Sequence, residues 1–131
     1  MNTDAMHKTL EGSQAGKLTF PEVVGMLTNA GVGSYFADLI RGEEIFYTTD
    51  GGTHREQMTL PPTKVADGFS QTGIVAAIRA AQADRIRFPE FIKQAMAAGI
   101  VAYWAFLTGK KVIYFGCKGE FHVEEFPRPK S

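Results

Sequence analysis

The sequence predicts an α+β fold, an internal duplication of an α-α-β-β-β unit with pseudo-twofold symmetry and an antiparallel sheet packed on helices. The first observation is a repeat at a constant offset of 68 residues, which relates Phe20-Pro21-Glu22 to Phe88-Pro89-Glu90, and Tyr35, Ala37 and Leu39 to Tyr103, Ala105 and Leu107. The second is that helical and alternating apolar patterns follow one another in the same order in both copies. Because a duplicated chain usually folds as two copies of one unit, we expect a single domain over 1–131 built from repeats of about 1–64 and 65–131.

Bulk properties exclude several classes of protein. The 131 residues are 44% hydrophobic and 21% charged, which is typical of a soluble globular domain. A formal net charge of zero argues against nucleic-acid binding. The single cysteine, Cys117, allows no intrachain disulfide, and neither a signal pattern nor an apolar run of about 20 residues is present. We therefore expect a cytoplasmic protein without membrane contact, and no motif predicts a cofactor.

The helical pattern begins with a capping box. Thr19 precedes Pro21, and Glu22 stands where its side chain can reach back to the Thr19 backbone. The apolar positions that follow have helical spacing and end before Gly31, in the place of a left-handed cap. The second copy has the same spacing, but Arg87 replaces the capping threonine, so we expect that helix to start less sharply. Helices over 70–83 and, less strongly marked, over 3–15 are expected to precede these two.

Strands over 34–40 and 44–49 are expected to form a hairpin, followed by a third strand over 53–60 and its counterpart over 120–126. Alternation places one apolar set on one face: Tyr35, Ala37, Leu39, Ile45 and Tyr47 in the first copy, and Tyr103, Ala105, Leu107, Val112 and Tyr114 in the second. This alignment requires the offset to fall from 68 to 67 at the turn. The pattern leaves open whether the strands form one sheet or two.

The opposite face of the hairpins is also apolar. It is expected to carry Phe36, Ile40, Phe46, Trp104, Phe106, Ile113 and Phe115. A sheet with one solvated face shows polar residues there. We therefore expect this face to be covered by the other unit or by a partner chain, and a homodimer would place Trp104 and Phe106 in its interface.

The run FPEVVGMLTNAGVGSYFADL, the GEEIFYTTDG hairpin and the ending GEFHVEEFP resemble a YbcV-like family of small prophage-encoded bacterial proteins. The similarity extends over nearly the whole chain. That family is a domain of unknown function, and some of its members are labelled phage envelope protein. The resemblance implies a phage-derived gene and supplies no catalytic residues.

Two sets of residues are candidates for a site. The tyrosines fall into the pairs Tyr35/Tyr103 and Tyr47/Tyr114, which predict either cross-strand packing against the helices or an aromatic cleft for a small ligand or peptide. His54 and Glu56 recur as His122 and Glu124, and two such pairs meeting near a twofold axis would form a four-ligand metal site. The alternative is ordinary His–Glu pairing on a polar strand face.

These patterns favour a non-enzymatic binding or protein-interaction module that uses the second sheet face or the cleft between the units. The binding candidates are Tyr35, Tyr47, Tyr103, Tyr114, Trp104 and Phe106, and the partner would be an unidentified protein or a small-molecule ligand. The alternative is a metal-binding protein or enzyme that acts at the paired His-x-Glu sites.

Overall fold

The structure is a computed structural model that describes residues 1–127, so the last four residues of the expected second repeat lie outside the described residues. Four helices and six strands follow in the order α1 (Thr3–Gln14), α2 (Phe20–Asn29), β1 (Val32–Asp38), β2 (Glu43–Thr48), β3 (Thr53–Gln57), α3 (Gln71–Gln82), α4 (Phe88–Ala97), β4 (Ile100–Phe106), β5 (Lys111–Gly116) and β6 (Phe121–Glu125). The α+β class is confirmed.

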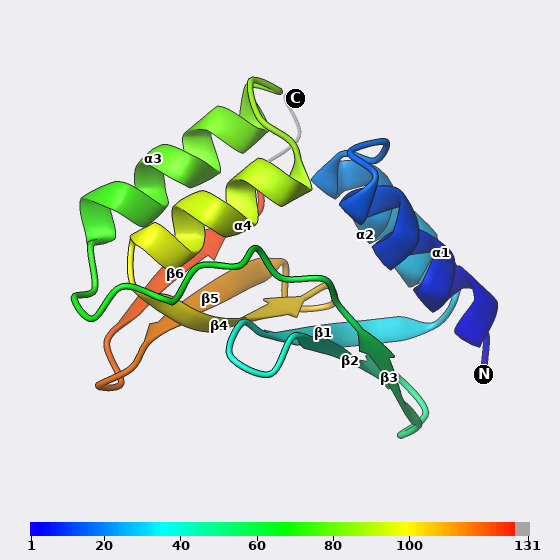
Figure 1. Cartoon of the computed structure of the whole chain (residues 1–131). Helices are drawn as coiled ribbons and strands as arrows, with labels where there is room; N and C mark the ends of the chain where they lie inside the picture. Colours follow the sequence, from blue (N-terminus) through cyan, green and yellow to red (C-terminus); the bar gives the residue numbers. More distant parts are fainter. Residues whose placement is uncertain (128–131) are drawn as a thin grey trace.

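The strands form one six-stranded antiparallel sheet in the order β3-β2-β1-β4-β5-β6. β1 and β4 pair at its centre, while β3 and β6 form its two edges. The helix pairs α1–α2 and α3–α4 stand side by side on the same face of this sheet (Figure 1). The question of one sheet or two, which the sequence left open, is thus answered by the β1–β4 pairing.

Every element of the first half has a counterpart of equal length 68 residues later, including β2 and β5, which begin at Glu43 and Lys111. The expected change of offset to 67 at the turn is therefore wrong. The residues with positive φ recur at the same offset as Gly16 and Asp84, Gly31 and Gly99, Gly42 and Lys110, and Gly51 and Gly119. A residue in the left-handed region lets the turn keep its length without a deletion.

The constant offset changes which side chains of β2 face the helices. Tyr35 is opposite Phe46, just as Tyr103 is opposite Tyr114, and Phe46 is completely buried. The expected faces of Ile45, Phe46 and Tyr47 are therefore inverted, because a one-residue slip in a strand exchanges its two faces. The turn residue Ile40 is 64% exposed and does not belong to the second face of the sheet.

Local sequence explains how α2 and α4 begin; both start with Phe-Pro-Glu and are called the FPE helices below. The Thr19 side chain accepts a hydrogen bond from the Glu22 amide, and the Glu22 carboxylate accepts one from the Thr19 amide at 2.9 Å, so the predicted capping box is confirmed. Arg87 makes no side-chain cap, also as expected. α1 is better packed than its sequence suggests, because Thr9 and Ser13 are buried beside Met6 and Leu10. The hydroxyl of Thr9 donates to the Met6 carbonyl, which makes its burial tolerable.

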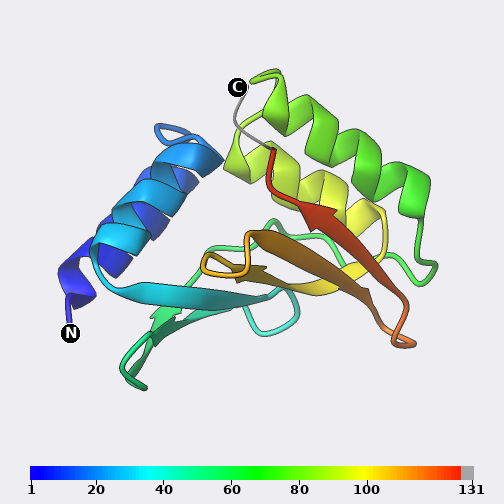
Figure 2. The ribbon, with the colours of Figure 1, turned by 180° about the vertical axis from the view of Figure 1, so that it is seen from behind.

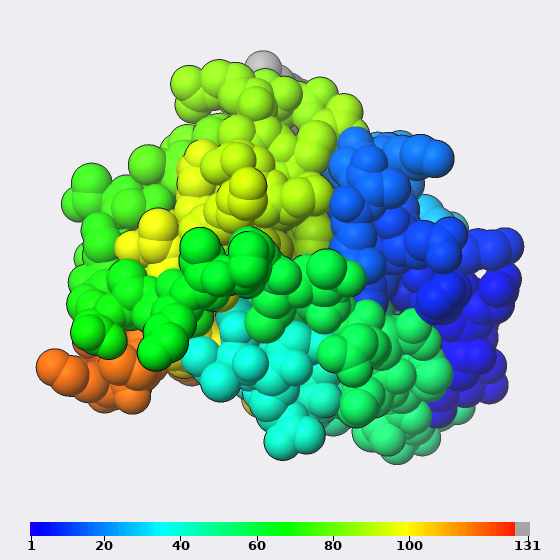
Figure 3. Space-filling view, viewed as in Figure 1, coloured from blue at the N-terminus to red at the C-terminus, as the bar shows by residue number. Residues whose placement is uncertain are grey.

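The core lies between the sheet and the four helices, and each helix contributes one apolar stripe to it. A connecting segment over 58–70 runs from the edge strand β3 to α3 and crosses the front of the molecule below α4 (Figure 3). It is fastened to the second helix pair by the Ala66 amide, which donates to the Met96 carbonyl at 2.9 Å, and by the Ser70 amide, which donates to the Ala98 carbonyl at 2.8 Å. In the described residues, every helix is too short or too polar to cross a membrane.

Candidate functional site

A cavity of about 340 Å³ lies between the two helix pairs, with the sheet as its floor. α1 and α2 contribute one wall, α3 and α4 the other, and the end of β6 closes one side. Figure 2 shows that the two helix pairs approach each other most closely above the central strands and run apart toward the two edges of the sheet. A volume of this size falls within the range of pockets that hold small molecules.

Three of the four predicted tyrosines lie on the floor of this cavity. Tyr35, Tyr103 and Tyr114 are 4–6% exposed, and the Tyr103 ring contacts the other two, with ring centroids 5.5 Å from Tyr114 and 6.3 Å from Tyr35. Burial raises the pKa of all three hydroxyls well above its ordinary value. No hydrogen bond joins any of these hydroxyls to another described residue, but the three oxygens keep some accessible surface, because Trp104 Nε1 is the one fully buried unpaired side-chain polar atom in residues 1–127.

Glu44 is the acid of the cavity floor. It lies on the helix-facing side of β2 opposite Ala37 and is only 5% exposed. Burial, and then the nearby charge of Glu56, raises the pKa of Glu44 to about 8. Within residues 1–127 no cationic side chain pairs with its carboxyl group and no hydrogen bond stabilises its charged form. A buried carboxyl without a partner costs free energy unless something else binds it.

The charged groups around the cavity are mostly acidic. Glu44, Asp84, Glu124 and Glu125 line it, and Arg87 is the one cationic side chain among its described lining residues. That guanidinium is paired with Asp84 at 2.6 Å. The Glu124 carboxylate pairs with Arg79 at 2.7 Å, so Glu44 stands without a compensating charge among the described groups.

Sequence reasoning missed Glu44 because it placed β2 in the wrong register. Glu44 alternates with Phe46 along β2, and both face the helices. Once Phe46 is assigned to the core, alternation alone requires Glu44 to be buried as well. The alternation in the sequence was therefore enough to predict that Glu44 is buried, but the incorrect offset assigned Glu44 to the other face.

The other predicted binding residues lie on the opposite face of the sheet. Tyr47, Trp104 and Phe106 are half-buried there, and Trp104 contacts Tyr47, Phe106 and Phe36 with ring centroids 5.2–5.7 Å apart. No described helix covers this face (Figures 1 and 2). The six predicted aromatic residues thus divide into two groups, one at the cavity and one on the uncovered face.

The two His-x-Glu pairs do not converge. β3 carries His54 and Glu56, β6 carries His122 and Glu124, and the full width of the sheet separates the two strands. Six strands spaced about 4.8 Å apart separate the two edges by roughly 24 Å. The alternative of a four-ligand metal site required the two pairs to meet, and the strand order keeps them apart. Within residues 1–127 no group of three or more His, Cys, Asp or Glu side chains is placed to hold a metal ion.

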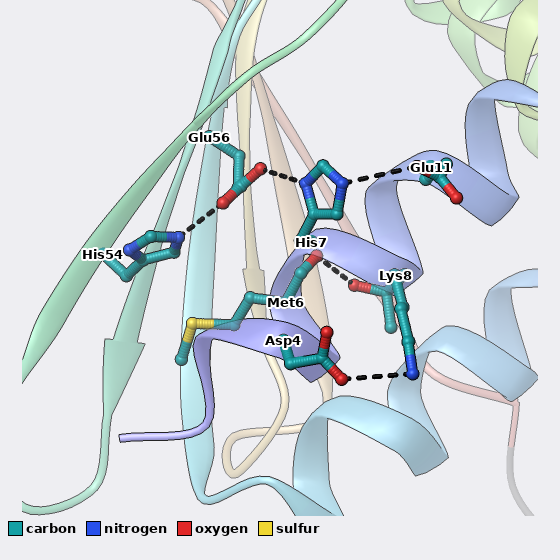
Figure 4. Close-up of polar contacts among 8 residues, drawn as sticks. Asp4, Met6, His7, Lys8, Glu11, His54 and Glu56 are labelled. Carbon is teal, nitrogen blue, oxygen red and sulfur yellow. Dashed lines mark hydrogen bonds and ion pairs between the residues drawn. The ribbon is translucent and has the colours of Figure 1, made fainter.

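Each pair instead fastens an edge strand to a helix. Glu56 binds His54 on its own strand and also His7 of α1, whose Nδ1 lies 2.8 Å from its Oε1 (Figure 4). Burial tends to raise the pKa of Glu56, but the hydrogen bonds and charges of the two histidines outweigh it and lower that pKa. In the second half Arg79 of α3 takes the role of His7 and binds Glu124. Ordinary His–Glu pairing, the alternative considered for these residues, describes both edges.

A family model described as "Protein of unknown function (DUF1398)" matches residues 17–125. The chain is a member of the DUF1398 family. The matched residues run from just before α2 to the end of β6, and they contain Glu44 and the three cavity tyrosines. The elements that build the cavity floor thus lie inside the region that defines the family.

This DUF1398 member is similar to uncharacterized proteins of Mycobacterium bovis and of two strains of Mycobacterium tuberculosis, with 31% identity over 109 residues in each case. The aligned region covers 82% of this chain and 66% of each relative. The chain therefore spans slightly less than two thirds of the length of these relatives.

Proposed function

We propose that this DUF1398 protein is a non-enzymatic binding module that holds one small, mostly apolar molecule in the cavity between its helix pairs. The observation that carries the proposal is a set of polar groups on nearly buried residues of the cavity floor, the three tyrosine hydroxyls and the Glu44 carboxyl, that border an open volume and make no hydrogen bond to another described residue. Buried polar groups are normally paired. A ligand in the cavity would supply the missing partners.

We also infer that the two halves descend from one duplicated unit and are related by a pseudo-twofold axis. The constant offset of element bounds and of positive-φ residues supports this. So does the central register, since Phe36 is opposite Trp104 and these two residues are themselves 68 apart. An axis through that pair places the cavity between equivalent helix pairs. A prophage origin, suggested by the YbcV-like resemblance, is part of the same proposal.

Binding in the cavity can be tested by filling it. Ala81 of α3 lines the cavity, whereas Ala76 of the same helix is exposed. We expect the neutral dye N-phenyl-1-naphthylamine to bind the native protein with saturable fluorescence enhancement, and Ala81→Phe to weaken its binding at least about tenfold because the phenyl ring occupies the site. Ala76→Phe should bind the dye as the native protein does. Unchanged binding by Ala81→Phe would show that the dye sits elsewhere and would contradict the proposal.

The uncovered sheet face supports a second candidate function, self-association. Its aromatic centre is formed by Trp104, Tyr47, Phe106 and Phe36, which are in contact and only half-buried in the single chain. A six-stranded face about five residues long covers on the order of 500 Å² in projection, which approaches the roughly 800 Å² per partner of a standard interface. We propose that the partner is a second copy of this chain, because a twofold dimer needs one self-complementary patch.

The dimer is tested by sedimentation equilibrium. We expect the native protein to sediment as a dimer and Trp104→Glu to sediment as a monomer, since a charge buried in an apolar interface costs several kcal/mol. Ile40→Glu is the matched control: it places the same charge on a 64% exposed side chain in a turn and should leave the dimer intact. A monomeric native protein at micromolar concentration would refute self-association and leave the cavity proposal unaffected.

A further inference from the structure

Resting on the proposed function of the cavity, we propose that its ligand is a small organic cation, an amine or quaternary ammonium group on an apolar body, whose charge pairs with Glu44. The geometry brings a carboxyl group and aromatic rings to one cavity. Glu44 and the rings of Tyr35 and Tyr103 share the floor, and Phe88 and Phe91 of α4 belong to the wall. An aromatic ring attracts a cation over its face, most strongly where water is excluded.

The charges around the cavity select the sign of the ligand. Among the described lining residues four are acids, and the single guanidinium, that of Arg87, is occupied by Asp84. Asp84 is paired with Arg87 and Glu124 with Arg79, which leaves Glu44 and the exposed Glu125 as the lining acids without a described cationic partner. An anion would find no free cationic side chain among the described lining residues. A cation would satisfy Glu44 and relieve the cost of burying it, because a buried charge is tolerated when it is paired.

Binding of a cation should release a proton. The pKa of Glu44 is raised to about 8 in the empty cavity, so at pH 7 its carboxyl group is mostly protonated. An entering cation favours the carboxylate, and the proton passes to solvent: Glu44–COOH and the free cation become the ion pair and one released proton. The affinity should therefore rise with pH, by up to about tenfold per unit between pH 6 and 8.

Other titrating groups near Glu44 have to be separated from this effect. The groups that face it or border its neighbour Glu56 are Tyr35 on β1, Tyr103 on β4, Glu56 and His54 on β3, and His7 and Glu11 on α1. The tyrosines stay neutral in this range because their pKa is raised well above its ordinary value. The hydrogen bond to Glu56 raises the pKa of His7, so the contribution of His7 has to be separated from that of Glu44. A His7→Gln variant that keeps the pH dependence would assign it to Glu44.

Two isosteric probes test the inference. Benzyltrimethylammonium and 2,2-dimethylpropylbenzene have the same shape and differ only in the charged nitrogen. Their affinities are measured by chemical-shift titration of the native protein and of Glu44→Gln, and calorimetry in buffers of different ionisation enthalpy counts the released protons. We expect the cation to bind the native protein at least about tenfold more tightly than its neutral isostere, and Glu44→Gln to abolish this difference. The neutral isostere should bind both proteins equally, which shows that the variant is folded.

Each other outcome has a distinct meaning. Equal binding of the two isosteres by the native protein, without proton release, overturns the inference that the ligand is a cation. The cavity would then remain a binding site for neutral molecules. Preference for the cation that survives Glu44→Gln also overturns the inference, because the charge would then be recognised elsewhere. Absence of binding by either isostere, together with failure of the naphthylamine dye, overturns the binding function itself.

Discussion

Glu44→Gln is expected to stabilise the protein by about 3 kcal/mol at pH 7, which corresponds to roughly 10 °C in the melting temperature of a chain of this length. The pKa of Glu44 is about 8 in the folded protein and near its ordinary value of 4.5 in the unfolded chain. Below pH 4.5 both states carry the proton and burial of the carboxyl group has no pH-linked cost. Above it the unfolded chain loses its proton while the folded protein keeps one, so the free energy of unfolding falls until about pH 8.

The pH profile provides the check. Thermal unfolding of the native protein and of Glu44→Gln should give nearly equal stability at pH 4 and a gap that grows by about 1.4 kcal/mol per pH unit toward pH 8. Glu90→Gln, on an exposed carboxyl of α4, is the control and should change stability by less than about 0.5 kcal/mol at any pH. A constant gap, or a destabilised Glu44→Gln, would mean that the carboxyl is paired in solution. A gain in stability on removal of a group is typical of a site kept for binding.

Gly99→Ala is expected to destabilise the protein by about 3 kcal/mol or more, whereas Gly31→Ala at the equivalent position should cost only about 1 kcal/mol. Both glycines follow an FPE helix with similar backbone angles, φ 81° at Gly99 and φ 83° at Gly31. A Cβ at Gly31 would meet nothing within 4 Å. A Cβ at Gly99 would overlap the backbone carbonyl of Gly68, and Phe69 Cα would lie 3.0 Å away.

The difference in lost unfolding free energy between Gly99→Ala and Gly31→Ala measures the contribution of the connecting segment over 58–70. Both variants carry the cost of a left-handed alanine, so subtracting one from the other removes that cost and leaves the overlap with residues 68–69. The overlap is with backbone, which can move only if the hydrogen bond from the Ser70 amide to the Ala98 carbonyl is disturbed. Denaturant unfolding of both variants measures the difference. Equal losses would show that the segment is not held against Gly99 in solution.

Much of the local structure could be predicted from short stretches of sequence. The capping box at Thr19 and the glycine after each FPE helix encode the beginnings and ends of helices through contacts within one turn. The third strands were predicted too long, to Leu60 and Phe126 instead of Gln57 and Glu125. Pairing with β2 and β5 sets those ends, and this pairing cannot be read from the strand's own residues.

The candidate site was predicted only in part. Tyr35 and Tyr103 were expected on one face with a cleft between the units, and both lie in the cavity. The predicted pairing of Tyr47 with Tyr114 follows from dropping one residue at the turn, whereas the constant offset of 68 aligns Tyr114 with Phe46. Lys110, which has a positive φ of 58°, occupies the place of Gly42, and a lysine gives no sequence signal for that conformation. The misalignment of β2 by one residue arose at this turn position, and because of it the sequence did not predict that Glu44 is buried.

The sequence by itself determined the order of the helices and strands and the ends of α2 and α4, because caps, turns and apolar periodicity act between residues within a few positions of one another. Only the tertiary structure decided which face of β2 meets the helices, that the histidine pairs lie on opposite edges, and that Gly99 alone of the two glycines is pressed against another segment. These features depend on strand register, strand order and packing between residues far apart along the chain. The same separation explains why a carboxyl group drawn from one half can meet tyrosines from both.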